Sequence, residues 1–389
     1  MPTLKPIGVL GSGVMGRGIA QVLASTGNDV ILCNIHKTTP MQAKNKLLVT
    51  LNKLQEKQKL TRDDVDKILQ KIYFTSDIHN FKQCDLVIET IAEDLHLKQE
   101  IFSKLDSHVN IKCILGSCTS SLSITAIASA CISPQRVLGI HFFNPPSAIS
   151  LVEIIPTIAT DNEILNQVIS RVKGWGKLPI IAKDTPGFIV NRIARPYYCE
   201  SLRIYEEGIA DFATIDWALK QMGKFKMGPF ELMDFIGNDI NYMATKLIWR
   251  QLYYEPRFKP SITQKKLFEV KWFGRKTERG FYDYHHEVKK PEPKQDEKLA
   301  HIIFNRVIAL LIAEAIHCLY LQLATKEDID LAMTKGVNYP HGLLRWADDI
   351  GLENILATLN SLHATYQEER YRSPVLLQTM VQQNKKFYP

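Results

Sequence analysis

The sequence lacks the cysteine pattern of a disulfide-stabilised or zinc-binding protein. Its seven cysteines are odd in number, widely spaced and include no C-x-x-C pair. Disulfide frameworks and structural zinc sites both use closely spaced cysteines. We therefore expect free thiols in a reducing compartment, and no metal site.

A leader and a charge-free apolar segment are also missing. The first residues, MPTLKPIGVLGSG, show neither the basic and apolar regions of a signal peptide nor the arginines of a transit peptide. The longest apolar stretch begins at His301 but carries Arg306 and Glu314, and a buried helix fits it better than a membrane span. These features predict a cytoplasmic protein without membrane contact.

A basic stripe of the kind that binds nucleic acid is missing as well. The formal net charge is +7 and the lysines are scattered, which suits a small polyanionic ligand better than a nucleic acid. With 45% hydrophobic and 23% charged residues, the composition is that of a globular protein. A chain of 389 residues is long enough for two or three domains.

What the sequence does have is a glycine-rich turn between a strand and a helix. An apolar run at 7–10 leads into G-x-G-x-x-G at 11–16. A helical pattern then continues to Ser25, and a second apolar run follows at 30–33. Strand, glycine turn, helix and strand in this order are typical of a dinucleotide-binding fold. The correct flanks on both sides favour a cofactor turn over a purely structural one.

Each glycine of this turn has a physical role. Gly11 permits the tight bend, Gly13 bares the backbone where a pyrophosphate approaches, and Gly16 lets the helix pack on the strand. The amides at the helix N-terminus then face the phosphates. We predict NAD as the cofactor, bound at this turn by Gly11, Gly13, Val14, Met15 and Gly16.

One position departs from the usual dinucleotide pattern. The acidic residue that binds the ribose would fall at position 34, which is Asn34 here. Asparagine can still bond a ribose, but it lacks the charge that repels a 2′-phosphate, and His36 and Lys37 lie close by. The choice between NAD and NADP therefore stays open at this position.

Strands and helices alternate through the first part of the chain. The segments that read as a strand with a helix, or as a strand alone, are 83–105, 111–130, 136–146 and 149–156. This alternation predicts an α/β fold with a doubly wound sheet, in which ligands bind beyond the carboxyl ends of the strands. Glu93, Ser120 and His141 each follow a predicted strand on that side.

Several segments together carry a family resemblance. They are VLGSGVMGRGIAQ, DLVIETIAEDLHLKQEIF, SCTSSLSITAIA, HFFNPP with LVEII, KDTPGFIVNRIARPYYCESLRIYEEG, MGPFELMDFIGNDIN and GRKTERGFYDY. Unrelated Rossmann dehydrogenases share only the first. The sequence resembles the 3-hydroxyacyl-CoA dehydrogenases over nearly its whole length. This implies NAD-dependent, reversible oxidation of a 3-hydroxyacyl-CoA to a 3-oxoacyl-CoA.

The resemblance implies catalytic roles for four residues. His141 would be the general base and Glu153 the carboxylate that orients it, while Ser120 and Asn191 would contact the reacting oxygen. The 12 positions between His141 and Glu153 predict a hairpin that places them opposite each other. Structural alternatives are a helix N-cap at Ser120 and a backbone-bonding role at Asn191. An unpaired Glu153 in an apolar strand would be costly.

The resemblance also implies contacts on the cofactor side of the pocket. Glu93 would lie near the nicotinamide, Lys98 near the CoA-bearing substrate, and Asn144 would help to shape the pocket. Besides Asn34, the family pattern is broken by Cys118, where asparagine is usual, and by Glu278, where glycine is usual.

The rest of the chain predicts two helical domains. We expect the NAD-binding domain over 1–182, a first helical domain over 183–284, a polar linker at 285–298 and a second helical domain over 299–389. The second is a degenerate repeat of the first, 114 positions on (191 to 305). The residues that keep this offset include the pairs Asn191 and Asn305, Glu200 and Glu314, and Asp216 and Asp330.

The duplication bears on partners and on substrate. Single-copy members of the family pair through this domain, so two copies could make either a homodimer or a monomer with an internal pseudo-dimer. The C-terminal segment is similar to the long bacterial 3-hydroxybutyryl-CoA and 3-hydroxyadipyl-CoA types, which leaves the acyl chain open. Two alternatives are a sugar-acid (gulonate-type) dehydrogenase and a catalytically silent, crystallin-like NAD-binding protein.

Overall fold

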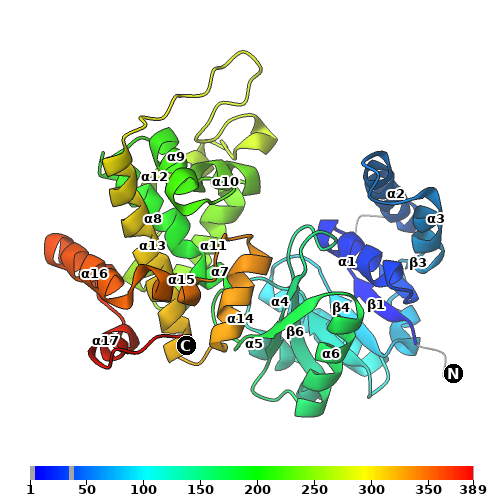
Figure 1. Ribbon diagram of the computed structural model, residues 1–389. Coiled ribbons are helices and arrows are strands. Elements are labelled where there is room, and N and C mark those ends of the chain that lie inside the picture. Colours follow the sequence, from blue (N-terminus) through cyan, green and yellow to red (C-terminus); the bar gives the residue numbers. More distant parts are fainter. Residues whose placement is uncertain (1–4, 35–38, 389) are drawn as a thin grey trace. The chain divides into compact units, whose positions relative to one another are not determined.

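The computed structural model describes residues 5–34 and 39–388, so His36 and Lys37 lie outside the described residues. Contacts divide the chain into two compact units, with the boundary between Phe188 and Ile189. The first unit is α/β and the second is all-helical (Figure 1). Each unit is described by itself.

The first unit is built on a sheet with the strand order β3-β2-β1-β4-β5-β6-β7-β8. The strands are β1 (Ile7–Leu10), β2 (Val30–Cys33), β3 (Ile72–Thr75), β4 (Leu86–Glu89), β5 (Ile114–Ser117), β6 (Val137–Phe142), β7 (Leu151–Pro156) and β8 (Leu178–Ile181). Neighbouring strands are parallel, except that β6 and β7 are antiparallel. The predicted doubly wound sheet is confirmed, with β1 and β2 at the predicted bounds.

Helices follow most of these strands. They are α1 (Val14–Ser25), α2 (Pro40–Glu56), α3 (Arg62–Gln70), α4 (Leu95–His108), α5 (Ile124–Ala128) and α6 (Asn162–Gly174), with short 3₁₀ turns η1 (Ile78–Gln83) and η2 (Pro134–Arg136). The inner strands are almost wholly apolar and buried, as expected where helices cover both faces of a parallel sheet. Capping boxes at Thr39 and Thr61 fix the starts of α2 and α3.

The second unit contains both helical repeats. Its helices are α7 (Val190–Ile193), α8 (Arg195–Glu206), α9 (Phe212–Gly223), α10 (Pro229–Ile236), α11 (Asn238–Gln251), α12 (Ile262–Glu269), α13 (Glu297–Tyr320), α14 (Lys326–Leu331), α15 (Leu343–Ile350), α16 (Leu352–Tyr366) and α17 (Val375–Gln382). Short turns are η3 (Pro256–Phe258), η4 (Arg275–Thr277), η5 (Ala332–Gly336) and η6 (Glu369–Tyr371). Residues 287–296 form no helix or strand.

The two repeats use the same local devices. Asp216 accepts hydrogen bonds from the backbone N–H groups of residues 230–231, at 2.8 and 2.9 Å. Asp330, its counterpart, accepts from those of residues 344–345, at 2.8 and 3.1 Å. In both repeats a glycine precedes the bonded amides, because a Cβ there would lie within 2.5 Å of the aspartate. The repeat seen in the sequence is therefore a repeat of structure.

Helix α13 is the long apolar segment that begins near His301. It is long and apolar enough to cross a membrane by length and composition, but 72% of its most apolar 18-residue window is buried. It packs against α8, α9, α15 and α16 as the central helix of the second unit. Its buried Arg306 and Glu314 are both ion-paired, which suits a protein core.

Candidate active site

His141 and Glu153 face each other across the antiparallel strands β6 and β7. The strand register pairs them directly, and His141 Nδ1 lies 2.6 Å from Glu153 Oε2. The imidazole is 6% exposed and the carboxylate is fully buried. With the carboxylate on Nδ1, the neutral ring keeps Nε2 as its proton acceptor. The hairpin predicted from the 12-residue spacing is confirmed.

Two aromatic rings lie close to the imidazole. The ring centre of Phe143 lies 4.5 Å from that of His141, and the ring centre of Phe188 lies 5.7 Å away. His141 itself lies within β6, one residue before its end, rather than just beyond the strand as the sequence predicted. The strand is six residues long, so the antiparallel ladder continues past the site and fixes the position of His141.

The loop after His141 is held by two residues that the sequence did not single out. Lys177 is buried and donates hydrogen bonds to the carbonyls of Pro146 (2.5 Å) and Ile149 (2.7 Å). Burial lowers the pKa of Lys177. A Cβ on Gly18 would lie 2.8 Å from Pro146, so α1 packs directly on this loop. Asn144 is exposed in the same loop.

Glu93 organises the loop that follows β5. Its Oε1 accepts hydrogen bonds from the Thr119 hydroxyl (2.5 Å), the Ser120 backbone N–H (3.1 Å) and the Ser121 hydroxyl (2.5 Å). Burial alone would raise the pKa of Glu93, but the charge of Lys98 and these hydrogen bonds outweigh it and lower the pKa. Glu93 and Ser120, two of the predicted site residues, therefore lie together.

The N-cap alternative for Ser120 is wrong. Helix α5 begins at Ile124, and its N-cap is Ser123, whose side chain accepts from the Ala126 N–H. Asp184 adds further acceptors for this helix, with bonds from the backbone N–H groups of residues 124 and 125 at 3.0 and 2.7 Å. The exposed Ser120 is not needed for capping.

Lys98 lies in the interior of the first unit. Its ammonium is 1% exposed, 2.6 Å from Glu89 Oε1 and 3.6 Å from Glu93 Oε2. Glu89 also accepts from the Ser117 hydroxyl at 2.7 Å and the Ile91 N–H at 2.6 Å. Lys98 is therefore linked through Glu93 to the loop that carries Ser120, and its contact with the substrate stays a prediction. The sequence signal for this cluster was an acid at the end of an apolar strand, Glu89.

The glycine turn has the geometry that a pyrophosphate needs. Gly11 has φ of +106°, and its backbone abuts Thr90. A Cβ on Gly16 would meet the Gly11 carbonyl, whereas a Cβ on Gly13 would meet nothing within 4 Å. Gly13 is the N-cap of α1 and has no side chain to occupy the amides of the first turn, which begins with Val14 and Met15. These residues fit a bound dinucleotide.

The structure also describes three further residues that the sequence singled out, Asn34, Asn191 and Cys118. Asn34 follows β2 and donates its backbone N–H to the Thr75 carbonyl at 3.1 Å. Asn191 lies in α7 of the second unit. Cys118 is half-buried, and burial raises the pKa of its thiol to about 12. No two of the seven cysteines form a disulfide, and the described residues hold no group of three His, Cys, Asp or Glu side chains fit for a metal ion.

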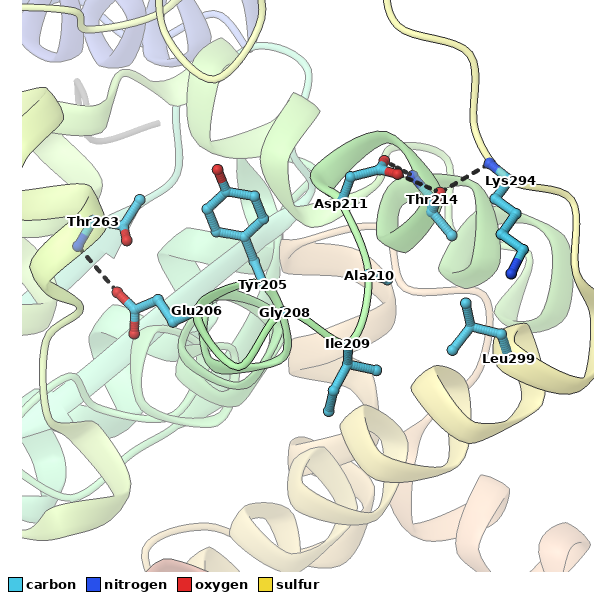
Figure 2. A pocket seen from close by; sticks show the side chains of 10 residues that line it. All are labelled: Tyr205, Glu206, Gly208, Ile209, Ala210, Asp211, Thr214, Thr263, Lys294 and Leu299. Atoms are coloured by element: carbon cyan, nitrogen blue, oxygen red, sulfur yellow. Dashed lines mark hydrogen bonds between the residues drawn. The ribbon is translucent and has the colours of Figure 1, made fainter.

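One hollow in the second unit has a volume of about 650 Å³ (Figure 2). Its carboxylates serve local structure: Glu206 accepts from the Thr263 N–H at 3.0 Å, and Asp211 from the Thr214 N–H at 2.8 Å. The Thr214 hydroxyl in turn accepts from the Lys294 N–H at 2.9 Å, which connects the segment 287–296 to α9. We assign no chemistry to this hollow.

Fold and site together define a nicotinamide-dependent dehydrogenase with a Rossmann-type domain. Residues 6–185 match the NAD-binding domain of 3-hydroxyacyl-CoA dehydrogenases, and residues 187–284 and 302–387 match their C-terminal domain. The chain belongs to the 3-hydroxyacyl-CoA dehydrogenase family. It is an NAD-dependent 3-hydroxyacyl-CoA dehydrogenase. This identification decides against the two alternatives that the sequence left open, a sugar-acid dehydrogenase and an inactive NAD-binding protein.

Relatives share either the whole architecture or part of it. The 3-hydroxyadipyl-CoA dehydrogenase of Escherichia coli K12 is 33% identical, with 97% of each chain covered. The human mitochondrial hydroxyacyl-coenzyme A dehydrogenase is 40% identical over 72% of this chain and 91% of its own. A crystal structure described as E. coli 3-hydroxybutyryl-CoA dehydrogenase superposes with a TM-score of 0.92 at 32% identity, covering 98% of this chain and 99% of its own.

Proposed function

We propose that this protein oxidises a short-chain or adipyl 3-hydroxyacyl-CoA, with His141 as the general base. The observation that carries the proposal is the buried pair of His141 and Glu153, joined at 2.6 Å. The sequence and the crystal structure that match nearly the whole duplicated chain, both from E. coli K12, are named for 3-hydroxyadipyl-CoA and 3-hydroxybutyryl-CoA. Their names supply the substrate class, and the pair supplies the chemistry.

The residues divide the reaction between them. The glycine turn would hold NAD, which would supply the acceptor for the hydride that leaves C3 of the substrate. His141 takes the hydroxyl proton at Nε2, and the buried Glu153 stabilises the imidazolium that forms. Ser120 and Asn191 hold the substrate oxygen, and Glu93 orders the loop that carries Ser120. Asn144 shapes the pocket from the exposed loop after β6.

Replacement of the base tests this assignment. His141→Gln should lower turnover of acetoacetyl-CoA with NADH by about 10³-fold, because the amide cannot exchange the proton. NADH binding, followed by fluorescence titration, should be unchanged. Glu153→Gln should lower turnover by about 10²-fold, since the ring loses its orienting charge. Near-normal turnover of His141→Gln would refute the role of His141.

The acyl group is tested by comparing kcat/KM across substrates. Acetoacetyl-CoA, longer 3-oxoacyl-CoA esters and 3-oxoadipyl-CoA should be assayed with NADH under the same conditions. We expect the highest kcat/KM for the four-carbon or the adipyl substrate. A clear preference for long, unsubstituted acyl chains would overturn the substrate proposal and leave the role of His141 intact.

We further propose that the protein is cytoplasmic and that its two helical repeats stand in for the paired domains of single-copy relatives. Both repeats belong to one compact unit of a single chain, which supports this reading. Light scattering coupled to gel filtration should then give the mass of one chain, 44.4 kDa. A dimer that persists on dilution would refute the proposal that the two repeats of one chain replace the pairing of two chains.

A further inference from the structure

The segment that carries Asn191 is too short to hold itself in place. Helix α7 spans four residues, Val190–Ile193, and a helix of this length depends on tertiary contacts. From within the first repeat, Arg195 donates to the Asn191 carbonyl at 2.9 Å and to the Thr245 hydroxyl at 3.1 Å. These bonds hold the backbone of α7 from within the first repeat.

A further hold on α7 comes from the second repeat. Arg192, next to Asn191, is 4% exposed, and its Nε donates to Glu314 Oε1 at 2.6 Å. Glu314 lies in α13 and is itself 1% exposed. Its other oxygen accepts from Arg257 at 2.7 Å, so two guanidinium groups fix the carboxylate. A buried pair of this geometry sets the position of the α7 backbone.

The same pair occurs a second time, with the repeats exchanged. Arg306 lies 114 positions after Arg192 and donates through Nε to Glu200, also at 2.6 Å. Glu200 is fully buried and is also bonded by Tyr371 at 2.6 Å. Each repeat therefore supplies the carboxylate for the arginine of the other.

The two ion pairs differ in the setting of the asparagine that precedes each arginine. The first adjoins Asn191 in α7, which is separated from α8 by the break at Ala194. The second adjoins Asn305, which is exposed in the middle of the unbroken α13. The ionic contacts match, whereas only one of the two asparagines follows the Thr-Pro-Gly-Phe turn of the dehydrogenase pattern.

We propose that Glu314 of the degenerate repeat is a positioning residue for the dehydrogenase reaction, acting through Arg192 on Asn191. The second repeat thus contributes to turnover without touching the substrate. The inference rests on the proposed function of Asn191 as a contact to the substrate oxygen.

Equivalent substitutions in the two ion pairs test this inference. Glu314→Gln should lower kcat for acetoacetyl-CoA reduction by about tenfold and leave KM for NADH unchanged. Glu200→Gln breaks the equivalent pair and should lower the melting temperature to a similar extent without lowering kcat. Equal kcat losses in both variants would show a merely structural role and overturn the inference. So would an unchanged kcat in Glu314→Gln.

A double-mutant cycle separates this inference from the proposed function. If Glu314 acts through Asn191, the kcat losses of Asn191→Ala and Glu314→Gln should be clearly non-additive. If Asn191→Ala alone keeps normal kcat, the proposed role of Asn191 fails. If Asn191→Ala loses activity and the losses are additive, only the positioning role fails. Should Glu314→Gln not fold, the milder variants Arg257→Lys and Arg370→Lys give the comparison, since Arg370 Nε lies 3.9 Å from Glu200 Oε2.

Discussion

Glu278 occupies a backbone conformation that suits glycine better. It ends the turn η4 with φ of 57° and ψ of 6°, in the left-handed region. A non-glycine residue there costs about 1–2 kcal/mol, which explains why glycine is usual in the family pattern at this position. The sequence showed the departure but not its cost, because the backbone angle is set by the neighbouring contacts.

Replacing this residue by glycine should therefore stabilise the protein. We expect Glu278→Gly to raise the free energy of unfolding by about 0.5–1 kcal/mol, since relief of strain exceeds the added entropy of the unfolded chain. Urea unfolding followed by circular dichroism measures it. Glu278→Ala keeps the Cβ and should show no gain. A gain in the alanine variant would point instead to the charge of Glu278.

Asn34 permits a test of cofactor choice. Asn34→Asp restores the charge that repels a 2′-phosphate, so the ratio of kcat/KM with NADH to that with NADPH should rise by about tenfold. Steady-state kinetics with acetoacetyl-CoA measure this ratio. Asn28→Asp, at the turn before β2, adds the same charge away from the ribose position and should leave the ratio unchanged. An unchanged ratio in Asn34→Asp would place the ribose elsewhere.

At the scale of elements, the contact between α1 and the loop after β6 couples the glycine turn to the base. Gly18→Ala would push a Cβ into Pro146, so we expect about 1–3 kcal/mol of destabilisation and a lower kcat. Gly174→Ala is the control, because a Cβ there meets nothing within 4 Å. It should be neutral or stabilising by up to about 1 kcal/mol. A normal kcat in Gly18→Ala would show that the loop tolerates displacement.

The strands that could be predicted from the sequence are more deeply buried than those that could not. The central strands are unbroken apolar runs, so β1 and β2 were predicted at their observed bounds. The edge strands β3 and β8 were not predicted: Tyr73 in β3 is 58% exposed, and β8 contains Pro179. A short, half-exposed strand carries no continuous apolar run, and only pairing with its neighbour defines it.

The site was predicted to a similar extent. Sequence spacing was enough to pair His141 with Glu153, because a hairpin is local. The partners of Lys177 and Gly18 were out of reach, since the contact of Lys177 with Pro146 spans 31 positions and is formed only by folding. Distant contacts of this kind leave no periodic signal.

At the scale of the whole molecule, a buried histidine among the charged residues of the second unit predicts that the free energy of unfolding falls in acid. Burial, followed by the charge of Arg257, lowers the pKa of His317 to about 4 from a model-peptide value of 6.5. Between these values the unfolded chain binds a proton that the native state does not. Stability from this group is therefore present above pH 6.5 and is lost as pH falls towards 4.

His317→Gln should flatten this dependence. Urea unfolding at pH 7, 5.5 and 4.5 should show a smaller loss of stability in the variant than in the parent protein. The range stays at or above pH 4.5 because Glu200, whose pKa is held down against its burial by Arg203, Arg306 and Arg370, loses its contribution at lower pH. Parallel curves for the two proteins would show that His317 does not titrate on unfolding in this range.

The exchanged arginine–glutamate pairs also determine how substitutions affect this protein. In a symmetric dimer of identical chains, one codon change alters both sides of the axis, so every gain or loss is doubled. Here the two sides are encoded separately, and a single substitution alters one side alone. One half can therefore change in sequence while the other keeps the residues that its chemistry needs.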